Sequence, residues 1–231
     1  MAIRRQTILS VLVAVLLIGL AFVAGRETAS TAPATTTPVP TTTTTTWAPS
    51  QMTTAIWPTI ASSVRYATPT AAAGGFALAY LHMTDPVVGA YRAGDTRSGE
   101  VPVRSSAGGP ETTVLVRQVA SDASWWVIGA ATQDITINMP STLARVNSPL
   151  TIAGVSTAYE AVVNISLRED DVSTPLATGT TMGGSMGQLR PFHRTLAFQT
   201  PTSTYGALVL YTISAKDGSV ASASVIRLRY H

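Results

Sequence analysis

The chain has 231 residues, of which 12% are charged, and its formal net charge is +3. The pI is about 9.5, yet beyond the N-terminal pair the basic residues are scattered, and only Arg227 and Arg229 lie two positions apart. Nucleic-acid binding needs many phosphate contacts, so this composition excludes a nucleic-acid partner. The absence of cysteine excludes disulfides, thiolate metal sites and a cysteine nucleophile.

An apolar run follows Arg4 and Arg5 at the start of the chain. Residues 8–25 contain no charge, and this length is at the short end of the range of about 17–25 residues that a membrane-spanning helix needs. The sequence therefore predicts that residues 1–26 form a signal-anchor helix, with a cytoplasmic N-terminus and the rest of the chain outside the cell membrane. A cleaved signal peptide is the alternative, and it predicts a secreted protein.

Residues 27–56 are rich in Thr and Pro and poor in apolar residues. A segment of this composition buries too little apolar surface to fold. We expect a disordered stalk that holds the folded part away from the bilayer, and its threonines are candidates for O-glycosylation.

Residues 57–132 predict a small α+β domain. Thr68 followed by Pro69 is typical of a helix start. Phe76 and Tyr80, four positions apart, lie on one face of the helix that follows.

A hairpin ends this segment, with expected strands at residues 112–119 and 124–130. Adjacent residues of a strand point to opposite faces, so Trp125 and Trp126 cannot enter the same core. We expect one of them to be buried and the other to lie on the exposed face or against the neighbouring domain. Both are candidate contacts for a ligand or partner.

Residues 133–231 carry strand signals only. Short strands at regular spacing are typical of an immunoglobulin-like β-sandwich, which would make the protein mainly β. The seven expected strands are residues 135–139, 150–155, 161–168, 175–181, 192–198, 207–215 and 222–230.

Alternation of apolar and polar residues predicts which face of these strands is buried. Arg227 and Arg229 of the last strand are expected to face water, where they are further candidate contacts for a ligand or partner. Four residues of the sixth strand are expected to point inward: Val209, Tyr211, Ile213 and Ala215. The residues expected in the core from strand 161–168 and from the last strand are Val163, Ile165, Leu167, Ile226, Leu228 and Tyr230.

Several short motifs of this segment occur in a recognisable order. They are SPLTIAG at 148–154, YEAVV at 159–163, PF at 191–192 and DGS at 217–219. With these motifs the C-terminal two-fifths of the chain resembles the immunoglobulin-like domain of bacterial spore germination proteins, the Gmad2 type. The resemblance implies a sandwich fold and a place outside the membrane of a Gram-positive bacterium, and it brings no catalytic residues or settled ligand.

The run GGSMG, residues 183–187, matches the nucleophile-elbow pattern G-x-S-x-G with Ser185 at its centre. That chemistry needs a strand before the serine and a helix after it, whereas Pro191 and the alternation around it predict a strand. The order of a hydrolase triad also fails for His193, because this histidine precedes the only later acid, Asp217. A glycine-rich loop between strands explains the motif better, and an envelope serine hydrolase that uses Ser185 is the alternative.

Glu160 lies where a loop turns into the strand at 161–168. A lone carboxylate there is expected to accept hydrogen bonds from loop N–H groups and to hold the turn, since a general acid would need a partner acid and a pocket. The charged run at 168–171 predicts a solvated hairpin tip. Because the three histidines lie far apart and no calcium-loop pattern occurs, we expect no metal site and no cofactor.

These features predict a non-enzymatic, membrane-anchored binding or scaffolding protein of the bacterial cell envelope, exposed outside the cytoplasm. The expected partners are the membrane, through the N-terminal helix, and a cell-wall polymer or an envelope protein, through loops and strand edges. A purely structural spacer is a second alternative.

Overall fold

The structure, a computed structural model, describes residues 49–119 and 122–230. The predictions for residues 1–26 and for residues 27–48 lie outside the described residues. The prediction that the disordered stalk continues to residue 56 is wrong, because Pro49–Thr54 form a short 3₁₀ helix and Ala55 and Ile56 are buried in the folded part. Within the described ranges, no helix has both the length and the apolar content that crossing a bilayer requires.

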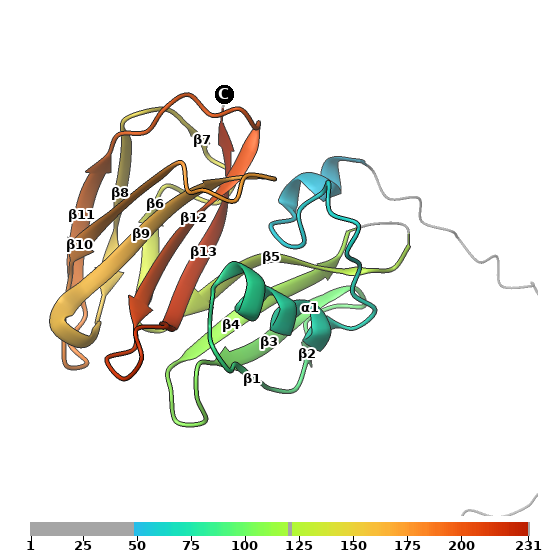
Figure 1. Cartoon of the computed structure of the whole chain (residues 1–231), viewed down its shortest axis with the longest axis horizontal. Helices are drawn as coiled ribbons and strands as arrows, with labels where there is room; N and C mark the ends of the chain where they lie inside the picture. The colour runs from blue at the N-terminus through green and yellow to red at the C-terminus, as the bar shows by residue number, and fades with distance from the viewer. Residues whose placement is uncertain (1–48, 120–121, 231) are drawn as a thin grey trace, which may run out of the picture. The chain divides into compact units, whose positions relative to one another are not determined.

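The described part of the chain is mainly β, and nearly all of its strand pairs are antiparallel (Figure 1). Four short helical segments accompany thirteen strands among the described residues. The helical segments are η1 (Pro49–Thr54), α1 (Pro69–Gly75), η2 (Phe76–Tyr80) and η3 (Tyr159–Ala161). The strands are β1 (Val87–Val88), β2 (Arg92–Ala93), β3 (Ser98–Arg104), β4 (Glu111–Gln118), β5 (Trp125–Thr132), β6 (Ile135–Met139), β7 (Arg145–Val146), β8 (Leu150–Ser156), β9 (Val162–Glu169), β10 (Ala177–Met182), β11 (Arg190–Leu196), β12 (Tyr205–Ile213) and β13 (Val220–Tyr230).

The predicted helix start is confirmed. The hydroxyl of Thr68 accepts a hydrogen bond of 3.2 Å from the N–H of Ala71, and Pro69 is the first residue of α1. The helix continues into the π-helical turn η2, where the rings of Phe76 and Tyr80 stack with their centroids 5.1 Å apart.

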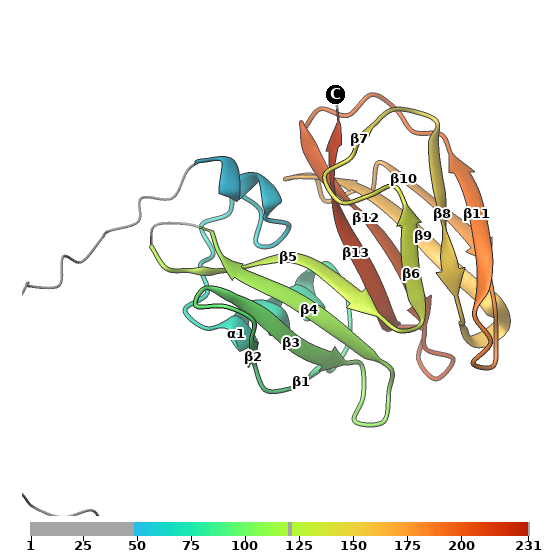
Figure 2. The same ribbon diagram turned by 180° about the vertical axis from the view of Figure 1, so that it is seen from behind.

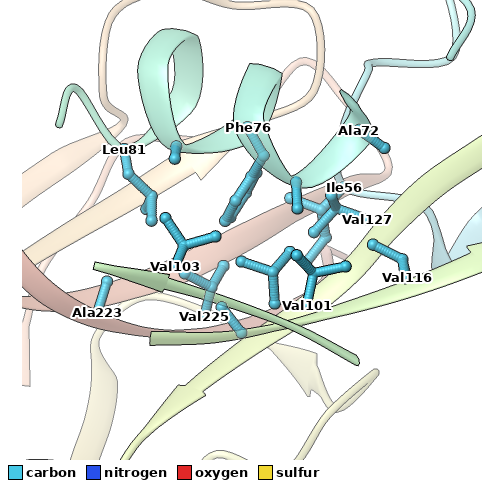
Figure 3. Close-up of a cluster of buried hydrophobic side chains, with 14 of the residues drawn as sticks. Ile56, Ala72, Phe76, Leu81, Val101, Val103, Val116, Val127, Ala223 and Val225 are labelled. Carbon is cyan, nitrogen blue, oxygen red and sulfur yellow. The ribbon is translucent and has the colours of Figure 1, made fainter. Parts of the chain in front are cut away.

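Helix α1 covers one face of the sheet that β3, β4 and β5 form, and its apolar side chains interlock with those of the sheet (Figure 3). The β4–β5 hairpin is present at the predicted place. Strand β13 adds Ala223 and Val225 to the same core, although both residues come from the C-terminal end of the chain.

The C-terminal half of the sequence forms two facing layers of strands, seen from the β8 side in Figure 2. Strands β10, β9, β12 and β13 make one layer in that order, and β11, β8 and β6 make the other. All seven expected strands occur, with their ends displaced by at most two residues. The residues predicted for the core between the layers lie there, with Ile226 partly buried at its edge.

Strands β12 and β13 are shared by two cores, because both faces of these strands are covered. On β12, Leu208 and Leu210 face the core between the two layers, whereas Val209 faces the core under α1. The prediction that Val209, Tyr211, Ile213 and Ala215 point into the sandwich is therefore wrong. Val209 and Tyr211 belong to the core under α1, and Ile213 and Ala215 are exposed. Strands buried on both faces have near-continuous apolar sequences, and the run around Val209 does not show by alternation which face is which.

The sheet itself crosses from residues 57–132 to residues 133–231. Strand β5 pairs with β13 at Ala130 and Val225, so the order β1-β3-β4-β5-β13-β12-β9-β10 is continuous. All described residues belong to one compact unit.

Candidate functional site

Trp125 and Trp126 point to opposite faces of β5, as predicted, but both are buried. Trp125 is 9% exposed and packs in the core under α1, with Tyr91 edge-on to its ring at 5.3 Å. Trp126 is fully buried against Ala55, and its Nε1–H donates a 2.9 Å hydrogen bond to Ser124 Oγ. Of the two places expected for the second tryptophan, the exposed face is wrong, because the segment after η1 covers the second face of β5.

Arg227 is buried, with 1% of its surface exposed, which corrects the prediction that it faces water. Its Nη1 and Nη2 atoms donate to the two carboxylate oxygens of Asp170, and its Nε donates to the carbonyl oxygen of Thr53 at 2.8 Å. A second layer of chain therefore covers this face of β13. Arg229, two residues later, is exposed as predicted. Whether Arg229 or the other three candidate residues contact a ligand stays a prediction.

The charged run at residues 168–171 is not a solvated hairpin tip. The guanidinium of Arg168 lies over the ring of Tyr80 at 4.6 Å and donates to the Tyr80 carbonyl oxygen at 2.6 Å. The carboxylate of Glu169 accepts hydrogen bonds from the N–H groups of Thr202 and Ser203. These charges are used to join β9 to neighbouring segments.

A groove of about 770 Å³ lies at one end of the strands. Its walls come from the β3–β4 loop, the β5–β6 turn, the β8–β9 connection, the β10–β11 loop and the β12–β13 hairpin. In Figure 1 these connections meet at the end of the strands opposite η1. A volume of this size is within the range of about 300–1,000 Å³ that is usual for ligand sites. This groove is the candidate functional site.

Ser185 lies in this groove, on the loop between β10 and β11. The loop is held against β8 because Gly184 donates to the Ser156 carbonyl oxygen at 2.9 Å and accepts from the N–H of Ala158. A Cβ atom on Gly184 would lie 1.7 Å from the carbonyl oxygen of Gln188, so only glycine fits. A strand follows the serine instead of the helix that a nucleophile elbow needs, and the described residues that line the groove include no histidine.

Glu160 also lines the groove, beside Tyr159. Its backbone has a φ of 59°, and Ala161 after it has a φ of 62°, a conformation that non-glycine residues adopt at a cost of about 1–3 kcal/mol each. The exposed carboxylate accepts no hydrogen bond within the described ranges. The prediction that this carboxylate holds the turn is therefore wrong: backbone bonds such as Ala161 N–H to the Ala158 carbonyl oxygen do so.

The groove carries charges of both signs. Lys216, from the β12–β13 hairpin, forms no ion pair with any described residue, and neither does Glu160. The third charged group, Asp134, accepts a 2.9 Å hydrogen bond from Ser222 Oγ. Because Glu160 and Lys216 are both exposed and unpaired in the described structure, their charges are available to a bound molecule.

Large apolar side chains surround these charges. Tyr159 is 72% exposed, Met186 is 94% exposed and Ile213 is 42% exposed, and all three line the groove. Exposed apolar groups that are gathered in one place and rimmed by polar residues mark interaction sites. The arrangement suits recognition by apolar contact and ionic pairing. Among the described residues no group of three His, Asp or Glu side chains is placed to hold a metal ion.

Sequence reasoning missed this groove as a site, although it named two of its residues. Ser185 and Glu160 lie far apart from Lys216 in sequence, and only the packing of the loops brings the three to one place. One sequence signal does point to the groove: YEAVV, one of the motifs that carry the family resemblance, contains Tyr159 and Glu160.

Comparison with known families gives a match over residues 134–219. These residues match the sequence model of Gmad2, described as the immunoglobulin-like domain of bacterial spore germination. The match covers the β6–β12 region and the β12–β13 hairpin, and therefore most of the groove. No curated protein and no solved structure matches the chain.

Proposed function

We propose that this protein is a membrane-anchored binding or scaffolding protein of the bacterial cell envelope, and that the groove is its binding face. The observation that carries the proposal is the groove itself, where Glu160 and Lys216 are unpaired and exposed apolar side chains surround them. Exposing Met186 and Tyr159 to water has no structural benefit, whereas covering them with a partner gains apolar burial.

The family match supports a bacterial protein with an immunoglobulin-like domain. On this proposal residues 133–231 are an immunoglobulin-like sandwich and residues 57–132 are a small α+β domain attached to it. Sandwiches of this kind bind ligands through the loops at one end of the strands, and the groove is built from such loops.

The positions of two contacts along β13 support a groove that is turned away from an N-terminal anchor. Arg227 contacts Thr53 near the start of the described chain, whereas Ser222 contacts Asp134 in the groove wall. Five residues of a strand span roughly 17 Å. If residues 1–26 are a signal anchor and residues 27–48 a stalk, the groove is presented outward, toward the wall or another envelope protein.

We propose that the protein is not an enzyme. Ser185 has neither the following helix of a nucleophile elbow nor a histidine beside it among the residues that line the groove. Its place in the loop follows from the glycines on either side. A serine hydrolase is the rival function, because the serine does lie in the groove.

The test is retention of the full-length chain on purified peptidoglycan and on immobilised envelope proteins. We expect saturable retention on one of the two, and a loss of retention in the variant Met186→Ser. The matched control is Met139→Ser, since Met139 is also more than half exposed but lies outside the groove. Absence of saturable retention on both materials would overturn the proposal and favour a spacer.

A further inference from the structure

From the contents of the groove we infer the chemical class of its ligand: an extended protein segment in which an apolar side chain lies between a basic and an acidic residue. This inference rests on the proposed function and deepens it. The carboxylate of Glu160 would pair with the basic residue, the ammonium of Lys216 would pair with the acidic residue, and Met186 and Ile213 would cover the apolar side chain.

The kinds of residue in the groove favour a protein segment over a glycan. Sugar recognition relies on flat aromatic rings together with amide and carboxylate side chains that bond neighbouring hydroxyls. The described lining residues include one aromatic residue, Tyr159, and no Trp, Asn or Gln. In contrast, Met186 and Ile213 offer aliphatic surface, and exposed methionine is typical of surfaces that accept peptide side chains.

The charges favour a segment that carries both signs. Glu160 comes from the β8–β9 connection and Lys216 from the β12–β13 hairpin, so they stand on separate walls of the groove. Neither forms an ion pair with a described residue. Because complementary charges fix the register and direction of a bound chain, such a pair distinguishes one order of charges along a peptide from the reverse order.

The experiment uses the full-length chain with ¹³C-labelled methionine methyl groups and two sets of synthetic, end-capped peptides. In the first set a Lys precedes a central Leu and a Glu follows it, with the two charges two, four or six positions apart. In the second set the Lys and the Glu are exchanged. The signal of Met186 reports binding, and that of Met139, which lies outside the groove, is the internal control.

We expect the Met186 signal to shift in a saturable way with peptides of one charge order. Peptides of the reverse order should bind about two- to fivefold more weakly, a difference of the size expected for exposed ion pairs. Replacement of the central Leu by Ala should weaken binding by about tenfold. The double variant Glu160→Lys/Lys216→Glu should invert the preference between the two sets. The control Arg145→Glu, an exposed charge change outside the groove, should leave the preference unchanged.

The inference is overturned if no peptide shifts the Met186 signal, if both orders of charges bind equally, or if the double variant keeps the original preference. A shift caused by soluble glycan strands and not by peptides also overturns it, while leaving the proposed function in place. Peptide binding without retention on envelope proteins or peptidoglycan would have the opposite meaning: the ligand class would stand and the proposed function would fail.

Discussion

The guanidinium of Arg227 and the carboxylate of Asp170 form two parallel hydrogen bonds, 2.5 and 2.6 Å long. The pair joins β13 to the connection after β9, and the Nε of Arg227 adds a bond to Thr53 at the start of the described chain. The ring of Tyr205 lies 5.2 Å from the guanidinium carbon. One buried arginine thus ties together three segments that are far apart in sequence.

Removal of this arginine should be strongly destabilising. In the variant Arg227→Met we expect the free energy of unfolding to fall by about 3–5 kcal/mol, because the carboxylate of Asp170 loses the buried guanidinium that pairs with it. The control is Arg229→Met, an exposed change on the same strand, which should alter stability by about 0.5 kcal/mol or less. Urea unfolding followed by tryptophan fluorescence measures both, and equal losses in the two variants would contradict the role of the pair.

The β10–β11 loop should not tolerate a side chain at Gly184. An added Cβ would lie 1.7 Å from the Gln188 carbonyl oxygen and 2.7 Å from that of Ser156, and backbone atoms cannot move aside as a flexible side chain would. We expect Gly184→Ala to lower the free energy of unfolding by about 1–3 kcal/mol or more. Gly108→Ala is the matched control, because no atom lies within 4 Å of its added Cβ. If the unfolding midpoints of both Gly184→Ala and Gly108→Ala equal that of the native chain, the loop is not held by the contacts around Gly184.

Stability should decline at high pH. Burial of the Tyr80 hydroxyl raises its pKa from 10 to about 12, against the smaller opposing effect of Arg168. The folded state therefore holds this proton more tightly than the unfolded state, so the contribution is complete below pH 10 and is lost as the pH rises toward 12. Burial raises the pKa of Tyr230 as well.

The measurement is the urea midpoint at pH 8 and at pH 11 for the native chain and for Tyr80→Phe. The variant should lose less stability between the two pH values, and the remainder should reflect Tyr230. Tyr159→Phe, a change at a largely exposed ring, should leave the pH dependence as in the native chain. If all three proteins decline equally, the burial of Tyr80 is not the cause.

The serine in the groove should be chemically inert. Because β11 and not a helix follows its loop, the strained elbow that exposes a nucleophilic hydroxyl is absent from the described structure. We expect no covalent labelling of the full-length chain by a fluorophosphonate probe, and equal retention on envelope material for the native chain and Ser185→Ala. Labelling that disappears in Ser185→Ala would establish the hydrolase instead.

Thr68 and Pro69 correctly predict the start of α1 from the sequence, because capping depends only on neighbours in sequence. Val209 was assigned to the wrong core, since a strand covered on both faces loses its alternation. The prediction from the helix cap, which is local in sequence, is confirmed. The prediction from alternation, which depends on what covers the strand, is wrong.

The candidate site shows the same division. The sequence by itself determined the mainly β class and the seven C-terminal strands, because period-two alternation is a local property. Only the tertiary structure decided that Arg227 is buried against Asp170 and that Glu160 and Lys216 face one groove. Both results depend on which loops and strands meet in space, and a sequence pattern does not record long-range packing.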